Sequence, residues 1–147
     1  MEIRPLTPTY AVSPQIDPAD LAAVKAAGYT TVIDNRPDGE IPSHLHTAVM
    51  KAAAEELSLA FVANPVIPGG LTMENVRIQS QTIADAPGPV FAYCASGNRC
   101  SVVWALVNAG TRSTDDLIRV PSKYGYNLEP LRGQIDALAA DAAGGKD

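Results

Sequence analysis

The segment with the clearest potential for chemistry is Cys94-Ala95-Ser96-Gly97-Asn98-Arg99. An almost wholly apolar run, 90–93, precedes it, and a second apolar run, 101–107, follows it. We therefore expect a loop between a buried strand and the N-terminus of a buried helix. The backbone N–H groups of such a loop can converge on an anion, and the helix end adds partial positive charge. The sequence thus predicts a cradle for an oxyanion.

Cys94 is the candidate nucleophile of this cradle. The dipoles of the loop and the positive charge of Arg99 favour the ionised thiol, so we expect a thiolate near neutral pH. Arg99 would contact two oxygens of the bound group with its planar fork, and Gly97 permits a backbone conformation closed to most residues. The alternative is that Cys94 is a small buried hydrophobe, as free cysteines usually are. The glycine, the arginine and the apolar helix that follow at this spacing favour the catalytic interpretation.

The other residues of the segment are candidates for binding the substrate through backbone N–H groups or hydroxyls. We assign this role to Ala95, Ser96, Gly97, Asn98 and, in the first turn of the helix, Ser101. Cys100 could resolve an oxidised Cys94 only within the narrow geometry of a disulfide. Packing in the first turn of the helix is therefore the interpretation that we favour for Cys100.

The elements that must position the cradle alternate between strands and helices. Periodicity and breaker residues predict strands over 29–34, 59–66 and 90–93, and helices over 18–27, 44–57, 73–84, 101–107, 115–120 and 128–140. This order predicts an α/β protein with one domain over 1–143, whose central, mainly parallel sheet is flanked by helices, and a flexible tail over 144–147. Ligands of such sheets bind beyond the carboxyl ends of the strands, which is where the cradle lies.

Composition excludes several classes of function. The chain has 147 residues, of which 46% are hydrophobic and 18% charged, enough for one sizeable core. Its formal charge of −5 argues against a nucleic-acid partner, because phosphate contacts need clustered Lys and Arg. No apolar run approaches the roughly 20 residues that span a bilayer, and the N-terminus lacks the apolar core of a secretory signal. We therefore expect a cytoplasmic protein with no membrane partner.

The sequence also predicts no metal and no organic cofactor. His44 and His46 are two residues apart, so on a helix they point in different directions, unlike the paired histidines of a metal-binding helix. The two cysteines, Cys94 and Cys100, are too few for a disulfide framework.

The run Tyr93–Arg99, together with Asp34–Glu40, resembles the beta-lactamase-hydrolase-like, phosphatase-like domain family. Segments 12–16 and 125–128 resemble it too, so the resemblance spans nearly the whole chain. It implies the fold of cysteine-dependent tyrosine and dual-specificity phosphatases. Cys94 then matches the nucleophile and Arg99 the oxyanion-binding arginine. In the implied reaction Cys94 attacks phosphorus, a phosphocysteine forms, and water hydrolyses it.

Three features depart from the phosphatase signature. Four residues, where the signature has five, separate Cys94 from Arg99, so the cradle has one N–H donor fewer. Tyr93 stands where the signature has histidine, which removes a contributor to thiolate stabilisation. Segment 67–70 contains no acid where the general-acid aspartate is expected. Proton donation to the leaving group, worth about 10²–10⁴-fold in rate, would then come from Asp38 or Glu40.

The four-residue spacing is similar to the active loops of rhodanese-type sulfurtransferases. In that alternative Cys94 carries sulfane sulfur as a persulfide, and no general acid is needed. We place phosphomonoester hydrolysis first, with phosphotyrosine as a candidate substrate, so the expected partner is a small oxyanion-bearing molecule or a phosphorylated protein or peptide. Sulfur transfer to an acceptor thiol is a close alternative. A catalytically silent module that binds oxyanions or a protein partner is the third.

Overall fold

The central sheet brings the carboxyl ends of its parallel strands to one edge. In the computed structural model, which describes residues 1–144, five strands form the order β1-β2-β5-β3-β4. Their bounds are Arg4–Thr7 (β1), Tyr10–Ser13 (β2), Thr31–Asp34 (β3), Ala60–Ala63 (β4) and Val90–Tyr93 (β5). Strands β2, β5, β3 and β4 run parallel, and β1 pairs antiparallel with β2. The register sets Ser13 and Asp34 on either side of Tyr93, so the loops after these three strands meet.

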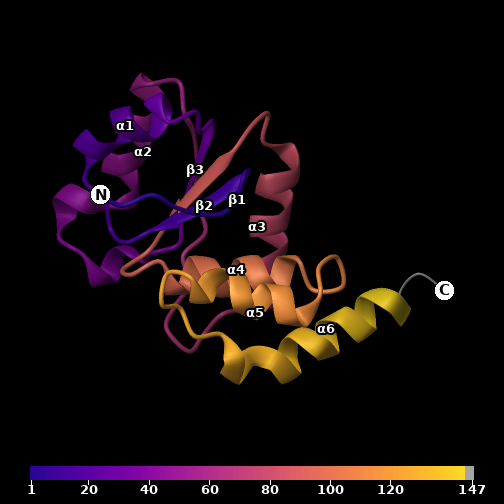
Figure 1. Ribbon diagram of the computed structural model, residues 1–147. Helices are drawn as coiled ribbons and strands as arrows, with labels where there is room; N and C mark the ends of the chain where they lie inside the picture. Colours follow the sequence, from indigo (N-terminus) through magenta and orange to yellow (C-terminus); the bar gives the residue numbers. More distant parts are fainter. Residues whose placement is uncertain (145–147) are drawn as a thin grey trace.

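Helices cover both faces of the sheet (Figure 1). The helices are α1 (Leu21–Ala26), α2 (Thr47–Glu56), α3 (Met73–Asp85), α4 (Asn98–Val107), α5 (Thr114–Ser122) and α6 (Arg132–Gly144). One core lies between the sheet and α1 and α2, and a larger core lies between the sheet and α3 to α6. Side chains of a strand alternate between the faces, so Phe91 and Tyr93 enter the first core while Ala92 and Cys94 enter the second.

This architecture confirms the predicted α/β fold with a mainly parallel central sheet. Boundaries differ where proline or a tight turn intervenes. The strand predicted over 59–66 ends at Ala63, before Pro65, which has no N–H to donate. The helix predicted over 44–57 begins at Thr47, because Ser43–Leu45 forms a separate 3-10 turn. Gly144 is the last residue of α6, and the rest of the predicted tail lies outside the described residues.

The hairpin of β1 and β2 was absent from the sequence predictions. Its strands are four residues each and joined by a tight turn at Pro8-Thr9, too short to give a period-two pattern. Pro5 is tolerated because β1 is an edge strand. The hairpin matters for the site, because it brings Arg4 and Tyr10 next to the elements that hold the cradle.

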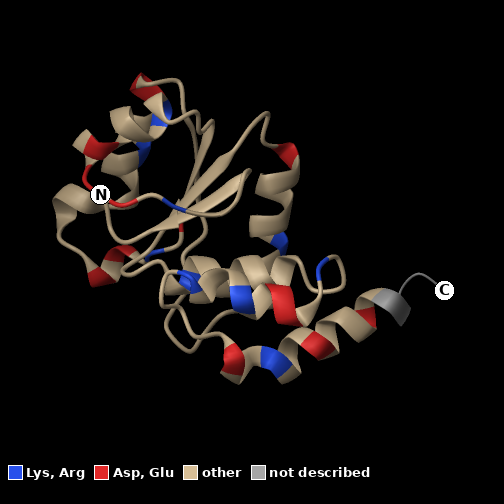
Figure 2. Cartoon of the chain, viewed as in Figure 1, with Lys and Arg blue, Asp and Glu red and all other residues tan. Residues whose placement is uncertain are grey.

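Charged side chains lie on the helices and in the loops, whereas the strands are nearly free of them (Figure 2). Arg4 and Asp34 are the charged residues within the five strands. Across residues 1–144, none of the helices combines the length and the apolar character needed to cross a membrane.

Candidate active site

The cradle is formed by the loop after β5 and the first turn of α4. Gly97 N–H donates to Cys94 Sγ at 3.1 Å. The pKa of Cys94 is lowered from 9.0 to about 5, chiefly by a hydrogen bond from the Cys100 thiol and further by the N–H groups of Cys100, Gly97 and Ser96, although burial acts in the opposite direction. Cys94 is therefore a thiolate at neutral pH, as its place before a helix N-terminus predicts.

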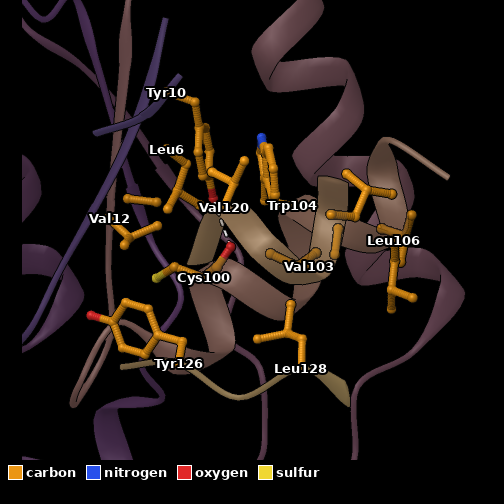
Figure 3. Close-up of a cluster of buried hydrophobic side chains, with 14 of the residues drawn as sticks. Leu6, Tyr10, Val12, Cys100, Val103, Trp104, Leu106, Val120, Tyr126 and Leu128 are labelled. Atoms are coloured by element: carbon orange, nitrogen blue, oxygen red, sulfur yellow. Dashed lines mark hydrogen bonds between the residues drawn. The ribbon is translucent and has the colours of Figure 1, made fainter. Parts of the chain in front are cut away.

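Cys100 is a core residue whose thiol also lowers the pKa of Cys94. Its side chain is fully buried in the cluster that also holds Tyr10 and Trp104 (Figure 3). Burial and the neighbouring sulfur of Cys94 raise the pKa of Cys100 well above its usual value, so the Cys100 thiol stays protonated. The Tyr10 hydroxyl donates to the Cys100 carbonyl at 2.9 Å, the dashed line in Figure 3. The expected packing role is thus accompanied by a donor role that the sequence did not indicate.

Gly97 lies against Tyr126. Its φ of +95° is in the left-handed region, and a Cβ there would be 2.2 Å from the Tyr126 hydroxyl oxygen. That hydroxyl donates to the Ser96 carbonyl at 2.6 Å and accepts from Arg4 Nη1, also at 2.6 Å. Tyr126 therefore fixes the outer side of the loop. In the sequence, the only signal of a role for Tyr126 near the cradle is that segment 125–128 resembles the phosphatase-like domain family.

The predicted substrate-binding residues have different surroundings. Ala95, Ser96 and Asn98 are exposed in the loop and at the helix start, and the Asn98 N–H donates to Ser96 Oγ at 3.2 Å. The Ser101 hydroxyl, by contrast, is buried and donates to the Gly97 carbonyl at 2.9 Å within α4. Because the Ser101 hydroxyl donates its hydrogen bond inside the helix, Ser101 helps to hold the loop in place. Its hydroxyl does not face solvent, unlike the exposed residues of the loop.

Arg99 is held by one edge of its guanidinium. Nη1 and Nη2 donate to the two carboxylate oxygens of Glu40, each at 2.8 Å, and Nη1 also donates to the Val66 carbonyl at 2.8 Å. A guanidinium has five N–H donors, so Nε–H and one Nη2–H remain. These two share an edge, and nothing in residues 1–144 accepts from them. The free edge matches the bidentate contact to an oxyanion that the sequence predicts for Arg99.

The two candidate proton donors have other partners. Hydrogen bonds from Arg99 and Arg36 lower the pKa of Glu40, so this carboxyl is ionised at neutral pH. The Asp38 carboxylate accepts from the Thr47 N–H at 2.8 Å and from the Thr47 hydroxyl at 3.0 Å. These are the contacts of a residue that stabilises a helix N-terminus, here that of α2. The carboxylates of Glu40 and Asp38 are thus both occupied as hydrogen-bond acceptors.

Tyr93, at the position of the signature histidine, points away from the nucleophile. Its ring is buried in the core under α1 and α2, on the opposite face from Cys94. The adjacent Asp34 is also buried, and its carboxylate accepts from the Arg36 N–H at 2.9 Å. Asp34 therefore ties the strand end to the following backbone.

A buried polar network fixes the loop after β4. The Gln79 side chain bonds to the side chains of Asn35 and Asn64 at 2.8–3.0 Å, and its Nε2 also donates to the Tyr10 hydroxyl at 3.1 Å. The Val66 N–H donates to the Asn35 carbonyl at 2.9 Å. The network thus sets the place of the Val66 carbonyl, which accepts from Arg99.

A cavity of about 420 Å³ lies beside Arg99. Aliphatic side chains that include Leu71, Val102 and Leu131 line it, together with Asn98 and Arg99. Its walls come from the loop before α3, from α4 and from the start of α6. Sequence reasoning missed the cavity because no local pattern indicates that these three segments meet.

A cysteine–arginine loop between the central strand of a parallel sheet and a buried helix defines the class of cysteine-phosphatase-like folds. Residues 2–111 match the family described as "Beta-lactamase hydrolase-like protein, phosphatase-like domain". The chain therefore belongs to this family.

Individual relatives agree with this assignment. A beta-lactamase hydrolase-like protein from Agrobacterium fabrum is 32% identical over 122 residues, which cover 82% of this chain and 28% of that protein. The chain thus spans less than a third of that relative. The crystal structure of a proposed phosphatase from Neisseria meningitidis is 34% identical with a TM-score of 0.81, and covers 94% of this chain and 99% of that one. The catalytic domain of the Saccharomyces cerevisiae PP-IP phosphatase SIW14, 8% identical, shares the fold with a TM-score of 0.69 over 98% of this chain and 92% of that one.

Proposed function

We propose that this phosphatase-like domain hydrolyses phosphomonoesters through a phosphocysteine on Cys94. The observation that carries the proposal is the free Nε–Nη2 edge of Arg99, five residues after a cysteine whose pKa is about 5 and with whose charge the guanidinium interacts. A thiolate is the nucleophilic form of cysteine, and a guanidinium edge is suited to two phosphoryl oxygens. The substrate would be a small phosphate ester or a phosphorylated protein or peptide.

In the proposed reaction the Cys94 sulfur attacks phosphorus while the ester oxygen departs with its electron pair. Arg99 and the loop N–H groups stabilise the charge on the transferring group. Water then attacks the phosphocysteine, phosphate leaves, and the thiolate is restored with a hydrogen bond from the Cys100 thiol. Since Asp38 and Glu40 both accept hydrogen bonds from other partners, esters whose alcohol departs readily as an anion should react best. Aryl esters, phosphotyrosine among them, have this property.

The test compares the wild-type chain with Cys94→Ser on p-nitrophenyl phosphate and on a phosphotyrosine peptide. We expect phosphate release from the wild type, loss of release in the variant, and an adduct of about +80 Da on Cys94 after rapid quenching. Release that persists in Cys94→Ser would refute the proposal.

Sulfur transfer is the second candidate, favoured by the four-residue spacing between Cys94 and Arg99 and by the absence of a proton requirement. In this reaction the Cys94 thiolate takes the outer sulfur of thiosulfate, sulfite leaves, and cyanide or a thiolate then removes the sulfur from the persulfide. An adduct of about +32 Da on Cys94 and thiocyanate formation would support it. Thiocyanate at background level would exclude it, and phosphate binding without either activity would favour a silent oxyanion-binding module.

A further inference from the structure

Side chains from three loops form a ring that starts and ends on the cradle loop. The Gln15 N–H donates to the Ala95 carbonyl, and Arg36 Nη1 donates to Gln15 Oε1, both at 3.2 Å. Arg36 Nε donates to Glu40 Oε1 at 3.2 Å, and Glu40 accepts twice from Arg99. The loops after β2, β3 and β5 are therefore joined, with Arg36 linking the first two and Glu40 linking the last two.

The contacts of Glu40 determine the plane of the Arg99 guanidinium. A free arginine side chain samples many rotamers, and ordering it costs conformational entropy. Two parallel hydrogen bonds to one carboxylate fix both the position and the tilt of the fork. The Val66 carbonyl uses a third donor, so the one edge that remains free is already oriented before an anion arrives.

The charge of Glu40 would by itself oppose the binding of an anion. Glu40 Oε1 accepts from Arg36 as well as from Arg99, so one carboxylate lies between two guanidinium groups. The three side chains together carry a net charge of +1. The side chain of Arg36 is 20% exposed and that of Glu40 26%, which keeps this attraction only partly screened by solvent.

We propose that Glu40 and Arg36 are positioning residues for the oxyanion contact: Glu40 orients the free edge of Arg99, and Arg36 offsets the negative charge of Glu40. This assignment rests on the proposed function only in that an oxyanion binds at Arg99. It also gives Glu40 a role other than proton donation.

The first test measures kcat, KM and the dissociation constant of inorganic phosphate for Glu40→Ala and Glu40→Gln. We expect Glu40→Ala to weaken phosphate binding and kcat/KM by about ten- to a hundredfold, and Glu40→Gln, which keeps one acceptor, to recover part of that loss. The matched control is Glu74→Ala, which removes a similar paired contact with Arg77 on the surface of α3 and should change neither quantity.

A merely structural role predicts a different set of results. The pKa of Cys94 is lowered chiefly by Cys100 and by the N–H groups of the loop, so the pH midpoint of Cys94 alkylation by iodoacetamide should stay well below 9.0 in Glu40→Ala, as in the wild type. A midpoint near 9, which would show that the loop itself had lost its structure, or phosphate affinity equal to that of the wild type, would overturn the assignment. So would a loss in Glu40→Gln that grows as the leaving group becomes more basic, because that pattern identifies a proton donor.

The second test uses Arg36. Arg36→Gln should raise KM and the phosphate dissociation constant several-fold at low ionic strength, with kcat nearly unchanged, because Glu40 then repels the anion. In the double variant with Glu40→Gln, the combined loss should be smaller than the product of the two separate losses. Multiplicative losses would refute charge compensation. If the chain binds phosphate but releases none from esters, the proposed function fails while the binding measurements still decide this assignment.

Discussion

Gly97→Ala tests the geometry of the cradle most directly. A side chain at φ +95° costs about 1–2 kcal/mol from backbone strain alone. The new Cβ would also lie 2.2 Å from the Tyr126 hydroxyl oxygen and 3.0 Å from its Cζ, so the ring must move and its bonds to Ser96 and Arg4 are lost, at about 1 kcal/mol each. We expect the free energy of unfolding to fall by about 3–4 kcal/mol in total.

Gly28→Ala is the matched control for this variant. Gly28 has a similar φ of +100° but nothing within 4 Å of its Cβ, so it reports the backbone strain alone. Gly97→Ala should exceed it by about 2 kcal/mol, which corresponds to about 4–8 °C in Tm for a domain of this size. The assay is urea and thermal unfolding followed by circular dichroism. Equal losses in the two variants, or an excess that persists unchanged in a Tyr126→Phe background, would refute the contact between Gly97 and Tyr126.

Three further results are expected. The rate of Cys94 alkylation by iodoacetamide should rise with pH through a midpoint near 5, and Cys100→Ala should raise that midpoint while Cys100→Ser, which keeps a donor, should raise it less. Folding lowers the pKa of Cys94 from 9.0 to about 5, so the stability that its thiolate contributes is complete above pH 9 and disappears as the pH falls toward 5. The difference in unfolding free energy between the wild type and Cys94→Ser should therefore shrink as the pH falls from 9 to 5. A difference that stays constant over this range would contradict the expected pKa shift. Gln79→Leu should lower the free energy of unfolding by about 2–4 kcal/mol, because it leaves buried partners unpaired, whereas the exposed Gln81→Leu on the same helix should cost far less.

The cradle could be predicted because its parts are contiguous. A buried strand, a glycine-containing loop and an apolar helix follow one another within 90–107, and local periodicity indicates each of them. The position of Cys94 before the helix N-terminus then predicts the direction of its pKa shift from backbone dipoles, although the chief cause, the Cys100 thiol, was not predicted. The alternation of strands and helices similarly predicts the layered α/β fold.

The contacts that orient the cradle could not be predicted, because they join distant parts of the chain. Glu40 and Arg99 are 59 residues apart, and Tyr126 and Ser96 are 30 apart. From the sequence Glu40 was a free carboxyl and a candidate acid. Only the register of β3 beside β5 brings it against Arg99, where an ion pair lowers its pKa. The pattern of residues along the chain does not indicate which strands pair or in which register.

The hydroxyl of Tyr10 accepts a hydrogen bond from Gln79 Nε2 and donates one to the Cys100 carbonyl. Its donor and acceptor roles are therefore both assigned, and neither neighbour can reverse direction. This arrangement couples the two positions. If position 79 loses its amide, replacing the tyrosine at position 10 as well removes the hydroxyl that would otherwise be left buried without its donor. We expect these two positions to covary among homologues, although they are 69 residues apart.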